Sequence, residues 1–427
     1  EALDRLAASG ALESVAGLGL SGQMLGAVLI DDAGKPVRDA ILWNDQRSLF
    51  ECAALIDKVP DIGMRTNCAP DPGITAPKLM WLAAHEPDTL SRATMLLLPK
   101  DYVRLWLTGE IATEPSDASG TMLMDCASAT WDDSLCDAAG WSLERLPRVV
   151  ASHAAAGGLR PHLAARWGLR PGIPVAAGAG DNFACALGVG VAEPGDGVVS
   201  LGTSAVVCLS DPAFRPAPDA AILTSPHAAP GQFLSMSVVM AATAALEWIA
   251  ATTGRDVASL AEKVDGDLAR HLSEAPVALP AFSGIRTPLN RPDAGGTFSG
   301  ITLRTDAAGL FYAALEGVAF QLKDCVEAQR ALGLEPHAFA VVGGGSRNAT
   351  WMTLIATLLN APLRRPQNGH LAAPLGAARL AQLAAGVGTP SDLTIKPQSA
   401  FDAEPDAQLA PILMERFSRY RRLTETI

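Results

Sequence analysis

An α/β fold is predicted by short apolar runs that alternate with longer helical patterns along the 427 residues. Each apolar run ends in a glycine turn, as strands often do. The runs are Val15–Leu20, Ile173–Ala177, Val198–Leu201 and Phe339–Val342. Apolar residues recur at helical spacing between these runs. The sequence predicts helices over Leu79–Ala84, Val238–Thr252, Ala307–Leu332, Trp351–Asn360 and Pro374–Ala385.

Composition and charge exclude several classes of protein. Hydrophobic residues make up 49% and charged residues 18%, which is typical of a chain with sizeable cores rather than a disordered one. The net charge of −12 argues against nucleic-acid binding. The most apolar stretch, Met236–Ala251, is interrupted by Thr243 and Glu247 and is too short to span a membrane.

Cysteine and histidine usage indicates a cytoplasmic protein without a metal site of its own. The seven cysteines are odd in number, and no pair has the spacing of a C-x-x-C motif. Such thiols are typically reduced and structural in the cytoplasm. The seven histidines show no pairing at the spacing of metal ligands. We therefore expect no protein-held metal, no membrane partner and a cytoplasmic location.

A polar break near the middle of the chain divides it into two domains. The segment 191–197 (VAEPGDG) carries glycine and proline after Gly188-Val189-Gly190. We place the domains at 1–190 and 191–427. Each domain then holds glycine turns at strand ends, and a cleft between two such domains is a natural place for a ligand.

The turn at 178–182 (GAGDN) offers a carboxylate, Asp181, directly after an apolar run and before a helix. Asp181 could cap that helix, since aspartate is favoured at an N-cap. It could also face the cleft and take a proton from a substrate hydroxyl. A dinucleotide fingerprint is excluded, because the third glycine of that motif is missing.

Three further turns follow apolar runs and admit two interpretations each. The turns at 200–204 (SLGTS) and 343–348 (GGGSRN) could cradle phosphate or let a flat ring approach the backbone, or they could be a plain hairpin and a left-handed turn. The turn at 21–26 (SGQMLG) could line a cleft or join the core. No Walker loop is present, because no G-K-[ST] follows a glycine run.

Taken in order, these turns resemble the FGGY family of carbohydrate kinases, most closely its xylulokinase branch, over essentially the whole chain. The matching stretches are GLGLSGQM (17–24), AILWNDQRS (40–48), GITAPKLMWL (73–82), LLPKDYVRLWLTGE (97–110), SDASGTM (116–122), GAGDNFACALGVG (178–190), SLGTSAV (200–206), GTFSGIT (296–302) and VVGGGSRNATW (341–351). The resemblance implies two ribonuclease-H-like domains of the actin/Hsp70 type, with sugar and ATP in the cleft between them. The first domain would bind sugar and the second nucleotide, and the last helix could pack back on the first domain.

The resemblance also implies a reaction and a set of site residues. The activity would be ATP-dependent phosphorylation of a ketopentose, D-xylulose to D-xylulose 5-phosphate, with Mg²⁺ and with Asp181 as general base. The implied sugar-binding residues are Met24, Leu25, Asp181 and Asn182. The implied nucleotide-binding residues are Gly202, Thr203, Ser204, Gly296, Gly344, Gly345 and Asn348. A small-molecule sugar would be the partner, and a homodimer is left open.

Two departures from the family pattern leave alternatives open. Xylulokinases have S-G-Q-M-H-G where this chain has Leu25 in place of the histidine. The family's first phosphate loop, an N-terminal D-x-G-T/S segment, is not present, so we expect the N-terminal strands of the fold to be missing from this sequence. The alternatives are a kinase for another ketose or polyol, a degenerate kinase that senses sugar, and a non-catalytic nucleotide-binding module of the actin/Hsp70 type.

Overall fold

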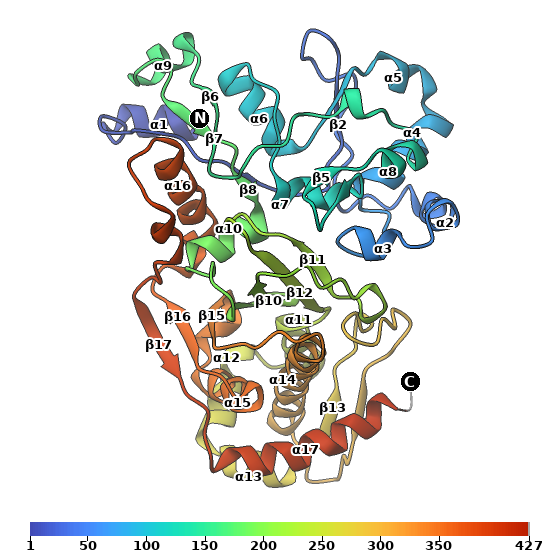
Figure 1. The fold of residues 1–427 in the computed structure, drawn as a ribbon. Helices are drawn as coiled ribbons and strands as arrows, with labels where there is room; N and C mark the ends of the chain where they lie inside the picture. Colours follow the sequence, from blue (N-terminus) through green and yellow to red (C-terminus); the bar gives the residue numbers. More distant parts are fainter. Residues whose placement is uncertain (426–427) are drawn as a thin grey trace.

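The chain folds into two halves, one above the other in Figure 1, joined where β8 (Ala179–Gly180), α10 (Asp181–Gly188) and α16 (Ala372–Ala384) meet. The computed structural model describes residues 1–425. None of the helices in this part of the chain combines the length and the apolar character needed to cross a bilayer.

The first half is built mainly from helices and very short strands. Its strands pair in twos: β2 with β3 antiparallel, β4 with β5 antiparallel, β6 with β7 antiparallel and β1 with β8 parallel. Its elements are α1 (Ala2–Ala8), β1 (Ser21–Gly22), β2 (Val28–Ile30), α2 (Leu49–Lys58), α3 (Ile62–Arg65), α4 (Thr75–His85), α5 (Pro87–Arg92), β3 (Met95–Leu97), α6 (Pro99–Thr108), α7 (Pro115–Ala118), β4 (Met124–Asp125), β5 (Thr130–Trp131), α8 (Asp133–Ala138), β6 (Ala155–Gly158), α9 (Pro161–Trp167), β7 (Pro174–Ala176), β8 and α10.

The second half is organised by a seven-stranded mixed sheet of order β11-β12-β10-β9-β15-β16-β17. At its centre, β9 pairs parallel with β15 and antiparallel with β10. The elements of this half are β9 (Asp196–Leu201), β10 (Ala205–Asp211), β11 (Leu223–Pro226), β12 (Phe233–Val239), α11 (Thr243–Thr252), α12 (Val257–Gly266), α13 (Leu268–Glu274), β13 (Val277–Leu279), β14 (Thr297–Ser299), α14 (Ala307–Ala331), β15 (Ala338–Val342), α15 (Ala349–Leu359), β16 (Leu363–Pro366), α16, β17 (Ser399–Ala403) and α17 (Leu409–Thr424).

Both faces of this sheet are buried. Alternate residues of a strand point to opposite sides, and here each set packs in a core of its own. Val199 and Val207 pack in the core that contains α14 and α15. Val198 and Cys208, one position along each strand, pack in the core that contains α10 and α16. The sheet of the second half is therefore covered on one face by a helix, α10, that belongs to the first half.

Backbone contact between α10 and α16 requires glycine on both helices. A Cβ on Gly188 would lie 1.8 Å from the carbonyl oxygen of Ala372, and one on Gly376 would lie 1.9 Å from that of Ala184. The buried guanidinium of Arg379 adds hydrogen bonds to the carbonyls of Leu187 and Ile395. These contacts join α10, which begins at Asp181, to α16 of the second half.

The expectation that the last helix packs back on the first domain is wrong. The last helix, α17, packs against α14, α15 and β13 of its own half. Its apolar side chains, such as Phe417, lie in the core of that half, and Arg416 forms a buried ion pair of 2.6 Å with Glu316 of α14. The helix of the second half that packs against the first half is α16, which contacts α10, β7 and β1.

Most of the predicted elements are present, with two differences. The predicted helix 238–252 begins only at Thr243, because Val238 and Val239 complete β12, where they pair with Val206 and Ala205. An apolar run alone does not distinguish a buried strand from a helix. The predicted strand Val15–Leu20 is reduced to a single parallel bridge between Leu18 and Val175.

Candidate functional site

Two predicted site segments leave the same edge of a two-stranded parallel sheet. In the pairing of β1 with β8, Ser21 lies opposite Ala179 and Gly22 opposite Gly180. The turn that carries Met24 follows β1, and Asp181 follows β8 as the first residue of α10. A Cβ on Gly180 would lie 2.7 Å from Sδ of Met24. The structure therefore brings Met24 against the backbone directly before Asp181.

The carboxylate of Asp181 is exposed, and no arginine or lysine pairs with it among the described residues. Its Oδ1 accepts hydrogen bonds from the backbone N–H (2.8 Å) and the side-chain amide (3.2 Å) of Asn182. The surrounding protein removes water and raises the pKa of Asp181, and the bond from the Asn182 N–H opposes this rise. Asp181 is the first helical residue of α10 and Gly180 is its N-cap, so the carboxylate does not stand at the N-cap position.

Leu25 adopts the left-handed backbone conformation, with φ of 68°, which is rare for a residue of its type. Its carbonyl oxygen accepts hydrogen bonds from Nζ of Lys78 (2.9 Å) and Oγ1 of Thr75 (3.0 Å), both on α4. Its side chain lies against Gly120, where a Cβ would be 2.6 Å from Cδ2 of Leu25. Helix α4 therefore holds the turn in its strained shape.

Lys78 is a fully buried cation that forms no ion pair within the described part of the chain. Besides the Leu25 carbonyl, Nζ donates to the carbonyl of Gly73 at 2.5 Å. Burial lowers the pKa of Lys78 to about 8, although Asp45 and Asp71 act in the opposite direction. Lys78 lies in the stretch GITAPKLMWL (73–82), where no local pattern indicates a role for it.

Two of the predicted nucleotide-binding turns lie at one edge of the large sheet. The turn Gly202–Ser204 follows β9, and the turn that begins at Gly343 follows β15, its parallel neighbour. Ligands of α/β sheets commonly bind at the carboxyl ends of parallel strands. Gly343, with φ of 89°, packs so closely that a Cβ would lie 2.5 Å from the carbonyl oxygen of Leu201, at the end of β9.

These two turns are held in different ways. The carbonyls of Gly202 and Thr203 accept hydrogen bonds from the backbone N–H groups of Thr243 (3.0 Å) and Ala242 (2.8 Å), at the start of α11. Asn348 caps α15 by accepting a hydrogen bond from the N–H of Trp351 at 2.8 Å. Gly344, in contrast, is exposed, and a Cβ there would meet nothing within 4 Å.

Gly296 is connected to this edge through aromatic packing. It precedes β14, and a Cβ on it would lie 2.3 Å from the ring of Phe282. Phe282 in turn packs on Trp248 of α11, with ring centroids 4.6 Å apart. Gly296 is thus placed by α11, whose first residues also hold the Gly202–Ser204 turn.

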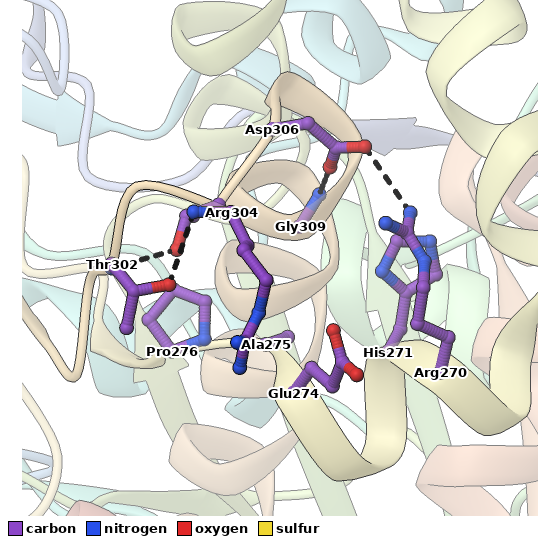
Figure 2. Close-up of a pocket in the computed structure, with 10 residues that line it drawn as sticks. Arg270, His271, Glu274, Ala275, Pro276, Thr302, Arg304, Asp306 and Gly309 are labelled. Atoms are coloured by element: carbon purple, nitrogen blue, oxygen red, sulfur yellow. Dashed lines mark hydrogen bonds and ion pairs between the residues drawn. The ribbon is translucent and has the colours of Figure 1, made fainter.

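Hollows elsewhere in the molecule are lined by other residues than those of the predicted site. A cavity of about 300 Å³ lies between the halves, lined by Cys68 and Asp71 from the first and by Met240 and Arg286 from the second. A much smaller pocket, of about 40 Å³, lies beside α13 and the start of α14. Figure 2 shows the residues that line it.

The pocket in Figure 2 belongs to a different region from the predicted site. Within it, Asp306 pairs with Arg270 at 3.2 Å and accepts a hydrogen bond from the N–H of Gly309 at 2.8 Å. None of the predicted sugar- or nucleotide-binding residues lines it. The cavity between the halves is not lined by any of them either, so neither hollow coincides with the predicted site.

Comparison with known proteins identifies relatives over nearly the whole chain. The N-terminal domain model of the FGGY family of carbohydrate kinases matches residues 3–188, and the C-terminal domain model matches residues 197–385. The chain is 38% identical to the xylulose kinase of Escherichia coli (strain K12) over 97% of this chain and 86% of that protein. It is 40% identical to the xylulose kinase of Klebsiella pneumoniae over 90% of this chain and 79% of that protein.

Solved structures agree with these matches. A crystal structure of a xyloylose kinase from Brucella ovis superposes with a TM-score of 0.92 at 39% identity, covering 99% of this chain and 87% of that one. A xylulose kinase from Rhodospirillum rubrum superposes with a TM-score of 0.89 at 27% identity, with the same coverage. The predicted actin/Hsp70-like fold of two ribonuclease-H-like domains is confirmed.

Lys78 is expected to make the free energy of unfolding depend on pH. The pKa of Lys78 is lowered from 10.5 to about 8 in the folded protein, whereas the unfolded chain keeps the ordinary value. Between these pH values the unfolded chain binds more protons than the folded chain, so stability rises with pH across the window. The full rise attributable to Lys78 is about 3 kcal/mol.

The variant Lys78→Met should lack this rise. Urea unfolding of both proteins at pH values from about 7 to 10.5 should show the wild type gaining stability relative to the variant as pH increases. Lys58→Met is the matched control, because Nζ of exposed Lys58 also donates to a carbonyl, that of Ala138, at 2.8 Å. A stability difference that stays constant with pH would contradict the prediction for Lys78.

Proposed function

Because the chain belongs to the FGGY family of carbohydrate kinases, we propose that its acceptor is the ketopentose D-xylulose, phosphorylated to D-xylulose 5-phosphate. The protein is an ATP-dependent sugar kinase. Because this is a family of kinases, membership argues against the alternative of a non-catalytic nucleotide-binding module. The relatives described above are xylulose kinases, and this supports the choice of sugar.

The observation that carries the proposal is the shared edge of β1 and β8. Their pairing places Met24 against Gly180, with the exposed carboxylate of Asp181 next in the chain. In the proposed site, Met24, Leu25 and Asn182 border the sugar, and Asp181 faces the hydroxyl that is to be phosphorylated.

We assign Asp181 as the general base. It would accept the proton of the sugar hydroxyl as the hydroxyl oxygen bonds to the γ-phosphorus of ATP and ADP departs. The loss of water around Asp181 raises its pKa, which makes the carboxylate a stronger base. Because the carboxylate forms no ion pair with a lysine or arginine in the described chain, its charge is not already neutralised.

We place the nucleotide on the second domain, with 1–190 and 191–427 as the two domains. The turns Gly202–Ser204 and Gly343–Asn348 lie at the ends of neighbouring parallel strands, where their backbone N–H groups can meet phosphate oxygens. In this arrangement Gly202, Thr203 and Ser204 meet phosphates, Gly296 lies near the triphosphate, and Gly344, Gly345 and Asn348 border the adenosine.

Mg²⁺ is proposed to arrive with ATP. The described residues contain no group of three or more carboxylate, histidine and cysteine side chains that could hold an ion by themselves. This suits a cation bound largely by phosphate oxygens and water, with one or two carboxylates of the protein. Asp181 is the carboxylate that the proposed site offers. When bound, the ion would neutralise charge on the phosphates.

The residue at position 25 favours another ketose or a polyol as the second candidate acceptor. Leu25 cannot donate or accept a hydrogen bond through its side chain, whereas the xylulokinase pattern has histidine there. An unpaired sugar hydroxyl in a site without water costs about 1–3 kcal/mol. ADP release measured with a panel of pentuloses, hexuloses and polyols distinguishes these acceptors, and no turnover with any of them would favour a sugar sensor.

Asp181→Asn is expected to lower kcat by about 10²–10⁴, because the amide cannot accept the hydroxyl proton. The KM for ATP should change little. The measurement is steady-state ADP release with the preferred sugar. Asp133→Asn is the matched control, since Asp133 is also an exposed first residue of a helix, α8. Near-normal turnover by folded Asp181→Asn would reject the assignment.

Gly344→Val tests the nucleotide site without disturbing the fold. A Cβ at Gly344 meets nothing within 4 Å, and this residue does not have the positive φ of Gly343. The branched side chain should obstruct adenosine and weaken ATP binding at least tenfold by calorimetry, which is about 1.4 kcal/mol, with sugar binding spared. Gly266→Val, also in open space, is the control. Unchanged ATP affinity would remove this turn from the site.

Leu25→His is expected to raise kcat/KM for D-xylulose, because the imidazole can hydrogen-bond a sugar hydroxyl and histidine tolerates positive φ better than leucine does. The assay compares both proteins over the same sugar panel at fixed ATP. Other sugars should gain less than D-xylulose. If the wild type already has a low KM for D-xylulose and the variant has a lower kcat/KM, the prediction is wrong and the site accepts D-xylulose with leucine at position 25.

A further inference from the structure

A buried cluster of charged residues lies behind the edge that carries Asp181. It comprises Lys100, Asp101, Arg104, Glu114 and Asp117, each at most 2% exposed. Nζ of Lys100 lies 2.8 Å from Asp101, 3.4 Å from Glu114 and 3.2 Å from Asp117. Burying so many charges is costly and seldom adds net stability, so the cluster calls for an explanation other than stability.

The cluster is close to electrically neutral. Burial raises the pKa of Asp117, and the attraction of Lys100 offsets this only in part. Burial by itself would lower the pKa of Lys100, but the three carboxylates together raise it above its ordinary value. Two cations, Lys100 and Arg104, therefore face three acidic side chains, and the raised pKa of Asp117 brings the cluster nearer to electrical neutrality.

Glu114 accepts four hydrogen bonds, and two of them come from serine hydroxyls. Oγ of Ser116 donates to Oε1 at 2.9 Å, and Oγ of Ser152 donates to Oε2 at 2.6 Å. The backbone N–H groups of Ser116 and Asp117 supply the other two, at 2.9 and 3.0 Å. A carboxylate bonded in this way has both of its oxygens fixed in direction.

Both serines reach from Glu114 to the turn that precedes Asp181. Oγ of Ser116 accepts a hydrogen bond from the N–H of Gly180 at 3.2 Å. The carbonyl of Ser152 accepts one from the N–H of Gly178 at 3.0 Å. One buried carboxylate thus holds the turn 178–180 at both ends, and the next residue is the exposed Asp181.

We propose that Ser116, held by Glu114, is a positioning residue that aims the carboxylate of Asp181 at the sugar. This rests on the proposed role of Asp181 as general base. Within the described chain the carboxylate of Asp181 is bonded by its neighbour Asn182 and by no cation, so its direction depends on the backbone of residues 180–182. A displacement of about 1 Å in a reacting group can cost 10²-fold in rate.

The same segment also touches the other side of the site. Gly120, four residues after Ser116, lies against the side chains of Leu25 and Met24, with a Cβ there 2.6 Å from Leu25 and 3.2 Å from Met24. Residues 116–120 therefore contact both turns that leave the edge of β1 and β8. A shift of this segment would alter the distance between the base and the wall of the sugar site.

The test is a pair of buried serine variants in one helical segment. Ser116→Ala removes the acceptor for the N–H of Gly180. Ser119→Ala is the matched control, because Ser119 is equally buried but its hydroxyl donates only to the carbonyl of Ser116, at 2.8 Å. Ser116→Ala should lower kcat at least about tenfold with the KM for ATP unchanged, and Ser119→Ala should stay within about twofold.

A double-variant cycle separates positioning from general destabilisation. If Ser116 acts through Asp181, adding Ser116→Ala to Asp181→Asn should cause no further loss of kcat. An equal loss in both backgrounds, or an equal effect of Ser119→Ala, would overturn the proposal while leaving the base assignment intact. Near-normal activity of Asp181→Asn alone would instead reject the proposed base, and with it this inference.

A second variant keeps the test decisive if Ser116→Ala does not fold. Ser152→Ala breaks the other connection from Glu114 but leaves the carbonyl of Ser152 in place for Gly178. It should also lower kcat, by a smaller factor, and should also have no effect in the Asp181→Asn background. Unchanged kcat for folded Ser152→Ala would count against Glu114 as the holder of this turn.

Discussion

The parallel pairing of β1 with β8 is the constraint on which the candidate site depends. It involves only two residues on each strand, yet it places the turn of Met24 and the start of α10 at the same edge. Two glycines make the close approach possible: a Cβ on Gly22 would lie 3.1 Å from Cβ of Lys100, and one on Gly178 would lie 2.3 Å from the carbonyl of Leu20. Small residues are therefore required where backbones meet around the candidate site.

So short a ladder needs support from outside the sheet, and buried polar groups provide it on both sides. On the side of β1, Lys78 and Thr75 of α4 bond the carbonyl of Leu25. On the side of β8, Glu114 bonds the turn before Asp181 through two serines. Buried and fully bonded polar groups fix direction better than apolar packing does, because a hydrogen bond tolerates little misalignment.

In the second half, regular strand pairing positions the glycine turns. Its central strands β9 and β15 are parallel neighbours within a seven-stranded sheet, so the turns that follow them meet at one edge. The same sheet is covered on one face by α10 and α16. Because α10 begins at Asp181, the helix that carries the proposed base packs directly on the sheet that carries the proposed nucleotide turns (Figure 1).

The sequence by itself determined the fold class, the glycine turns at strand ends and the family, because strand and helix periods, glycine turns and motif order are local properties of the chain. It also placed Asp181 directly before a helix. Only the tertiary structure decided which strands pair, that Leu25 takes a left-handed conformation, that α16 rather than α17 packs back, and that Glu114 reaches residues 178 and 180 through Ser116 and Ser152. These features join residues far apart in the chain, and no local pattern specifies which buried donor will meet which acceptor once the cores have formed.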